Sequence, residues 1–182
     1  MRPSFLLFLP VLFLPVQTPA ASLLVDRDSS SLQARVTASP PHSFEARVTD
    51  YEASIRLDSD GGVEAAEVSF LFAAVDTGNE GRDKKMLKWM DPDAHPRVSF
   101  TLKEVAVRDG VTVGLGELAI HGLSREVEVP FELTTEGDVV TLKGGLTIDY
   151  RDWSLDVIRM LFFTVRPELE VSFKLVGSLG EP

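Results

Sequence analysis

Residues 125–133 alternate strictly between polar and apolar side chains, and this alternation constrains the fold more than any other feature. The apolar positions are Val127, Val129, Phe131 and Leu133, and the positions between them are Glu126, Glu128, Pro130 and Glu132. Because successive side chains of a strand point to opposite faces, the segment predicts a strand with one dry and one solvated face. Pro130 has no amide hydrogen to give to a ladder, so we expect it at a sheet edge or a bulge.

The same period of two recurs through most of the chain. Residues 98–103 and 168–175 alternate as clearly, and Asp109-Gly110 between two alternating runs is typical of a hairpin. Weaker strand signals, recognised by β-branched and aromatic residues, cover residues 32–37, 44–48, 51–57, 68–75, 111–120, 139–148 and 161–165. Many short strands with regular turn signals predict an all-β protein, either a sandwich or a closed barrel.

One segment has the spacing of a helix. Asn79 is a suitable N-cap for a helix over residues 80–90, and Asp91-Pro92 ends it. Acidic residues come early in this segment and lysines late, which matches the helix dipole. Apolar residues on both faces of 68–75 predict that this strand is covered on both sides, by the helix outside and by a core or cavity inside.

The first residues have the order of a secretory signal peptide. A basic residue precedes an apolar run over 5–16, and small residues around Ala20 offer a cleavage site. The apolar run is shorter than the roughly 20 residues that a membrane-spanning helix needs. We therefore expect a signal peptide over 1–20, a folded domain over 21–182, and a periplasmic or secreted location.

The chain contains no cysteine and carries a net charge of −10. Without cysteine it has no lipid attachment site after the apolar run and no disulfide, so packing and the sheet must stabilise it. The excess of acidic groups repels phosphate backbones and anionic lipid surfaces. This argues against nucleic acid as a partner and against stable membrane insertion, and it leaves a homodimer open.

The chain contains histidines, serines and carboxylates, which catalytic and metal sites use, but they lack the spacing that such sites need. His42, His95 and His121 lie apart in expected turns, so we predict no metal. The chain has no Gly-x-Ser-x-Gly elbow and no phosphate-binding glycine loop in a strand-to-helix context. Carboxylate pairs are expected by chance among 28 acidic residues. We therefore expect no catalytic residue and no cofactor.

The sequence is instead rich in bulky apolar side chains, with 11 phenylalanines, two tryptophans and four methionines. Aromatic residues at strand spacing usually pack a solid core. A small barrel can also keep a cavity that holds one ligand. Alternation alone leaves both interpretations open and does not fix which face of each strand points inward.

Four motifs, in order along the chain, resemble those of the YceI-like family. They are DTGNEGRD at 76–83, HPRVSF at 95–100, GELAIHG at 116–122 and VEVPF at 127–131. The resemblance covers about residues 23–176. It implies an extended antiparallel lipocalin-like β-barrel with one short helix packed against it, secretion to the periplasm, and a hydrophobic channel that binds polyisoprenoids or other long amphiphiles. It implies no reaction, and it favours a cavity over a filled core.

The motif residues also have a structural interpretation. We expect residues 77–79 to form a turn and helix cap, Arg82 and Asp83 to lock that turn, and His121 and Gly122 to shape a hairpin.

The chain departs from the family pattern at three places. His95 stands where the family has tyrosine, Ser154 where it has glycine, and residues 156–165 are short where many members carry a glycine-rich loop. These departures leave the ligand's identity open.

We expect ligand contacts from inward-facing apolar side chains of the strands and the helix. The expected set is Phe70, Phe72, Met86, Leu87, Met90, Phe100, Leu102, Val129, Phe131, Trp153 and Phe173. The leading prediction is a non-catalytic binding protein for a long-chain amphiphile such as a polyisoprenoid, an isoprenoid quinone or a lipid. One alternative is a lipid-modifying barrel enzyme of the cyclase, isomerase or hydrolase type, for which Glu67, Glu117 and His121 are the polar candidates. The other is a structural or interaction barrel with a filled core.

Overall fold

The computed structural model describes residues 21–40, 42–160 and 163–180. The predicted signal peptide lies outside the described residues. The elements are β1 (Ala21–Ser39), β2 (His42–Val48), β3 (Glu52–Leu57), β4 (Val63–Leu71), the 3₁₀ helix η1 (Phe72–Ala74), β5 (Val75–Asp76), α1 (Glu80–Met90), β6 (Arg97–Arg108), β7 (Val111–Ile120), β8 (Leu123–Glu136), β9 (Val139–Asp149), the 3₁₀ helix η2 (Tyr150–Trp153), β10 (Arg159–Met160) and β11 (Phe163–Gly180).

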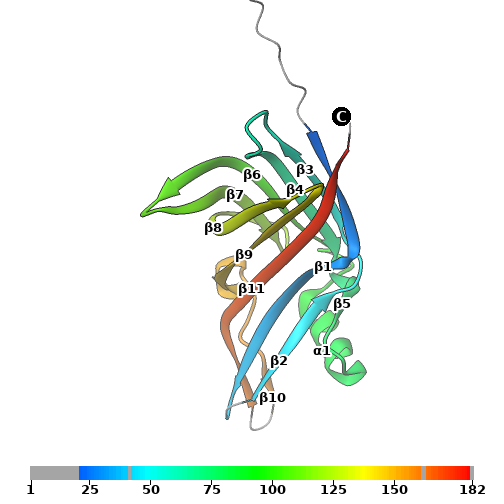
Figure 1. The fold of residues 1–182 in the computed structure, drawn as a ribbon. Coiled ribbons are helices and arrows are strands. Elements are labelled where there is room, and N and C mark those ends of the chain that lie inside the picture. Colours follow the sequence, from blue (N-terminus) through cyan, green and yellow to red (C-terminus); the bar gives the residue numbers. More distant parts are fainter. Residues whose placement is uncertain (1–20, 41, 161–162, 181–182) are drawn as a thin grey trace, which may run out of the picture.

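Eight of these strands form a closed antiparallel barrel (Figure 1). Around the barrel the order is β1, β11, β9, β8, β7, β6, β4 and β3, and β3 returns to β1 where Leu57 lies opposite Ala21. β2 pairs with the second half of β1, and β5 pairs with the end of β2. The predicted barrel is confirmed, and the long pairing of β1 with β11 decides it against an open sandwich.

Two hairpins are closed by residues with left-handed backbone. Asp109 (φ 51°) and Gly110 (φ 79°) join β6 to β7, and His121 (φ 50°) and Gly122 (φ 72°) join β7 to β8. Positive φ at both central residues gives the type I′ turn, whose twist matches that of the flanking strands. Both hairpin predictions are confirmed.

β8 and β9 separate below Phe131. Their pairing runs from Glu136 to Phe131, which lies opposite Gly144, and Pro130 is the first residue beyond it. Pro130 therefore sits on a locally free edge, as its missing amide hydrogen predicts. η2 follows β9 here, and the Trp153 indole Nε1 donates a hydrogen bond to the Leu118 carbonyl of β7 at 3.1 Å, which ties η2 to the barrel wall.

The strand predicted over 68–75 ends earlier than expected. β4 stops at Leu71, and Phe72–Ala74 form η1 before the short strand β5. Leu71 is 50% exposed, so the prediction that both faces of this segment are covered is wrong. The chain turns at η1 because it must leave the barrel wall to reach α1, which lies at the lower end of the barrel beside β2 and β5 (Figure 1).

α1 has the bounds that its sequence predicts. The Asn79 side chain accepts a hydrogen bond from the Arg82 amide at 2.9 Å, and Asp91 ends the helix in the left-handed conformation (φ 50°). No helix of the described residues is long and apolar enough to cross a bilayer.

Buried side chains form two clusters, called here the upper and the lower core cluster. The upper cluster includes Ile55, Val140 and Leu175, and the lower includes Met90 and Trp153. The upper half of the barrel is thus filled by packed side chains, as the filled-core interpretation expects, but this filling does not extend through the whole interior.

Candidate functional site

A cavity of about 540 Å³ occupies the remaining interior of the barrel. Its volume lies in the range of pockets that enclose most of a small ligand's surface. The side chains around it are overwhelmingly apolar. Among the residues expected to contact ligand, those that line it are Phe70, Phe72, Met86, Met90, Phe100, Val129 and Phe173.

The other four expected residues lie outside the cavity lining. Leu102 and Phe131 pack against the upper core cluster, where they fill the space left open by Gly114, whose missing Cβ would lie 2.9 Å from Leu102 Cδ1. Trp153 is buried in the lower core cluster, and Leu87 is half-buried on the flank of α1.

α1 faces the cavity with one stripe of side chains. Arg82, Lys85, Met86, Trp89 and Met90 all line it, at spacings of three and four residues. This spacing defines one side of a helix. The predicted stripe is partly wrong, because it included Leu87 and lacked Trp89, which the same spacing identifies.

Trp89 also fixes the helix to the opposite side of the barrel end. Its indole Nε1 donates to the Asp156 carbonyl at 2.8 Å, and its ring meets Tyr150 edge to face at 5.2 Å. Tyr150 in turn donates from its hydroxyl to the Val165 carbonyl at 3.3 Å, and burial raises the pKa of this phenol. These contacts join α1, η2 and β11 into one continuous wall.

Two strands of the lining, β1 and β2, were not expected from the sequence to contact ligand. β1 and β2 contribute Leu32, Ala34, Val36, Ala38, Phe44, Ala46 and Val48. These residues alternate with period two, which predicts a shared face, but the alternation does not say that this face points into a cavity.

The turn before α1 is locked as its motif predicts. The Thr77 hydroxyl donates to the Asp83 carboxylate, and Arg82 donates from Nε to Thr77 Oγ1 at 2.8 Å and from Nη2 to the Thr77 carbonyl at 2.6 Å. The Arg82 guanidinium carbon lies 3.8 Å from the centroid of the Phe44 ring. Arg82 thus has two roles, since it holds the turn and also borders the cavity.

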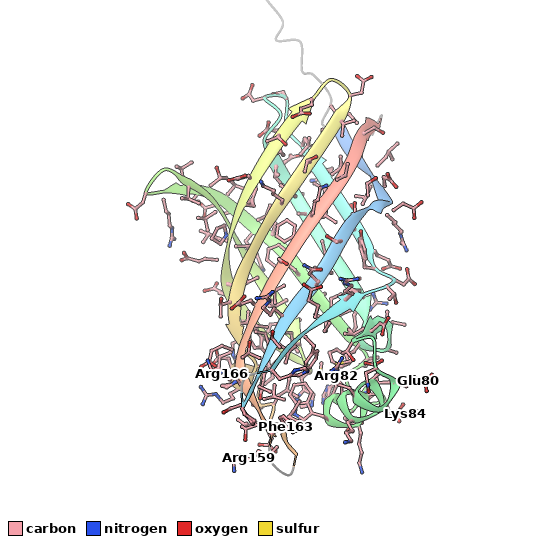
Figure 2. All side chains as sticks on the ribbon, turned by 60° about the horizontal axis from the view of Figure 1, so that its bottom comes forward. Glu80, Arg82, Lys84, Arg159, Phe163 and Arg166 are labelled. Carbon is pink, nitrogen blue, oxygen red and sulfur yellow. The ribbon has the colours of Figure 1, made fainter. Side chains whose placement is uncertain are left out.

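The cavity opens at the lower end of the barrel. At the upper end its lining is buried, as at Ile55 (2% exposed) and Leu175 (3%). At the lower end the lining includes Phe163, which is 46% exposed, together with the exposed His42 and Lys85. Figure 2 shows this end, with Arg82 on α1 and Phe163 at the start of β11. We call it the mouth.

The polar residues considered for catalysis lie elsewhere. Glu67, Glu117 and His121 are not part of the cavity lining. A hydrogen bond from Ser124, aided by the charge of Lys103, lowers the pKa of Glu117, so this carboxyl is held ionised. Across the described part of the chain, no three His, Asp or Glu side chains gather as a metal site would require.

Two of the three departures from the family pattern lie away from the cavity lining. Ser154 adopts φ 58°, the left-handed conformation that glycine favours. The ring of His95 lies 4.1 Å from that of His121, next to the β7–β8 turn. The third departure does border the cavity, through Ile158, Phe163 and Val165.

Comparison with known proteins agrees with this architecture. The YceI-like domain matches residues 24–177. The chain belongs to the YceI-like family. BcnA of Burkholderia cenocepacia has a similar structure, with a TM-score of 0.75 and 21% identity over 85% of this chain and 99% of that chain. No curated protein matches the chain.

Two further solved structures share the fold. A polyisoprenoid binding domain from Saccharophagus degradans, implicated in plant cell wall breakdown, has a TM-score of 0.67 and 16% identity over 91% of this chain and 100% of that chain. The YCEI protein of Campylobacter jejuni has a TM-score of 0.65 and 18% identity over 75% of this chain and 85% of that chain. At these identities the likeness establishes a common fold.

Proposed function

We propose that this protein is a periplasmic or secreted binding protein that holds one long-chain amphiphile, with the chain inside the barrel and the polar end at the mouth. The observation that carries the proposal is the apolar cavity of about 540 Å³, closed at one end and open at the other. An apolar chain that leaves water for such a cavity gains about 0.8 kcal/mol per buried methylene. Polyisoprenoids, isoprenoid quinones and other lipids fit this description, and one relative of the same fold is a polyisoprenoid binding domain.

Ligand binding rather than catalysis is the function that the lining supports. The described lining is mostly apolar or aromatic, and it contains no Asp or Glu that could act as an acid or base on a bound lipid. Its polar side chains are Gln33, His42, Arg82, Lys85, Ser99 and Tyr150, and the Tyr150 hydroxyl is bonded to the Val165 carbonyl. Glu67, Glu117 and His121 do not supply an acid or base, because none of them borders the cavity.

The proposed location rests on the predicted signal peptide over residues 1–20. Cleavage after Ala20 would release a chain that begins with β1, at Ala21. The mass of the mature protein recovered from the periplasm or the medium measures the cleavage site directly, and a chain that keeps its first 20 residues in either compartment would contradict this part of the proposal.

Native mass spectrometry of the mature protein, purified without detergent from its own compartment, tests the proposal. We expect a complex with one long-chain molecule per protein, and extraction with organic solvent should release and identify the molecule. The same spectrum gives the oligomeric state. A ligand-free mass, together with failure to take up polyprenyl and fatty probes, would support the barrel with a filled core instead.

A further inference from the structure

The charges that border the cavity are all of one sign. Arg82 and Lys85 are the only ionised side chains among the described lining residues, and no carboxylate is among them. His42 also borders the mouth, and an imidazole is either neutral or cationic. The whole chain has 28 acidic and 18 basic residues, so a lining with two cations and no anion runs against its composition.

Arg82 is held in place before any ligand arrives. Its Nε and Nη2 donate to Thr77, and its guanidinium lies against the Phe44 ring. A guanidinium has five N–H donors. In the part of the chain that the structure describes, the two hydrogens of Nη1 meet no acceptor of the protein, so a fixed cation keeps free donors at the edge of the cavity.

Lys85 lies next to Arg82 on the same side of α1. Residues three apart on a helix have Cβ atoms roughly 5–6 Å apart. All ion pairs among the described residues involve cations other than Lys85. No carboxylate of these residues therefore lies within 4.0 Å of the Lys85 ammonium. Both residues border the same cavity, one turn apart on α1.

Further cations and a few acids flank the mouth. Arg159 and Arg166 are exposed on β10 and β11 at the same end of the barrel (Figure 2). The nearby acids are Glu80, Asp83, Asp156 and Glu45; Asp83 is bonded to Thr77, and Glu45 pairs with Arg47. The four acids named here equal in number the cations Arg82, Lys85, Arg159 and Arg166, so the excess of positive charge belongs to the cavity lining and not to its surroundings.

From this placement we infer that the amphiphile has an anionic head, a phosphate or a carboxylate, that binds Arg82 and Lys85 at the mouth while its chain fills the cavity. The inference rests on the proposed function and adds the chemistry of the head group to it. A phosphate or carboxylate at this position accepts charge-assisted hydrogen bonds from the two cations. The apolar chain of the ligand keeps water from one side of these hydrogen bonds.

Paired ligands with the same chain test the inference. The mature protein is titrated by isothermal calorimetry with geranylgeranyl phosphate and with geranylgeraniol, both below their aggregation concentrations. The difference between the two affinities gives the contribution of the head group apart from that of the chain. We expect the phosphate to bind roughly 5- to 30-fold more tightly. Raising the ionic strength from about 0.02 to about 0.5 M should reduce this advantage and leave the alcohol unchanged.

Lys85→Gln removes one of the two cations and leaves the turn at Thr77 intact. We expect this substitution to weaken binding of geranylgeranyl phosphate about 3- to 5-fold and to leave binding of geranylgeraniol unchanged. Lys84→Gln is the matched control, because Lys84 is an exposed lysine of the same helix outside the cavity lining, so it makes the same change in net charge.

The outcomes separate the two proposals. Equal affinity for the two ligands, or equal weakening of both by Lys85→Gln, would overturn the anionic head and leave the carrier function standing. Failure of both ligands to bind would overturn the carrier function and the head group with it. Inorganic phosphate should not displace geranylgeranyl phosphate when it is added at the concentration at which the lipid phosphate saturates the protein. Full displacement would mean that the site binds free anions and would also overturn the inference.

Discussion

Val129 and Val140 provide a matched test of whether the lower interior of the barrel is hollow. Val129 is 7% exposed and borders the cavity, whereas Val140 is fully buried in the upper core cluster and does not border it. The two residues lie on the neighbouring strands β8 and β9. Since valine and phenylalanine are both good strand formers, replacing each valine by phenylalanine changes mainly the packing.

The expected free energies differ because only one site has room. At Val140 the larger ring must displace packed neighbours, which costs about 3 kcal/mol. At Val129 the ring enters the cavity, so a gain of about 1 kcal/mol from apolar burial is offset by a similar loss of rotamer freedom. The net change in the free energy of unfolding at Val129 should stay within about 1 kcal/mol.

Urea unfolding followed by circular dichroism measures both changes, and thermal melts provide a check. For a chain of this size 1 kcal/mol corresponds to about 2–4 °C in Tm, so Val140→Phe should lower Tm by about 6–12 °C. Val129→Phe should move Tm by less than about 4 °C and also weaken binding of geranylgeraniol, because the ring occupies its space. Equal destabilisation at the two sites would refute the reasoning and indicate a filled interior.

Three further predictions concern the local structure. Asn79→Ala removes the helix cap and should lower the free energy of unfolding by about 1 kcal/mol, seen as a lower urea midpoint with an unchanged slope; an unchanged midpoint would contradict the cap. Gly116→Ala should cost about 1–3 kcal/mol, because its Cβ would lie 2.5 Å from the Phe100 ring and 2.7 Å from the Thr101 carbonyl oxygen, and full stability would contradict this close packing of β6 against β7. A hydrogen bond from Arg151 lowers the pKa of Asp149 from its ordinary 3.8, so this contact stabilises the fold above pH 3.8 and is lost as the pH falls through the lower folded-state value. Asp149→Asn should therefore flatten the loss of stability on acidification below about pH 4, and an identical acid transition would contradict the assignment.

Local rules predict the elements of this fold well. The two type I′ turns, the cap at Asn79 and the alternating strands depend on residues close together in sequence, and each lies where its pattern indicates. The missed turn at Phe72–Ala74 has another origin. The strand pattern continues through it, but the chain has to leave the barrel wall to reach α1, and this depends on the tertiary arrangement.

The site could be predicted only in part, because a cavity and a packed core produce the same alternation. Phe100 and Leu102 have the same parity on β6, yet Phe100 borders the cavity and Leu102 packs into the core. Each of the two side chains lies against a glycine of β7, Phe100 against Gly116 and Leu102 against Gly114, and the register of β6 and β7 shifts between Leu102 and Glu104. Strand pairing of this kind cannot be derived from one sequence. Trp89, in contrast, could have been found from helical spacing alone.

If a long apolar chain lies inside the barrel, the two tryptophans of the protein can report it directly. Trp89 borders the cavity, whereas Trp153 is buried outside the lining, and the chain has no other tryptophan. Trp153→Phe and Trp89→Phe leave one reporter each. On titration with a long-chain alcohol that carries bromine near the middle of its chain, Trp89 fluorescence should be quenched and saturate at one chain per protein. Trp153 should be quenched much less, and the unbrominated alcohol should quench neither. Binding without quenching of Trp89, or with equal quenching of both tryptophans, would place the chain outside the cavity and contradict the account.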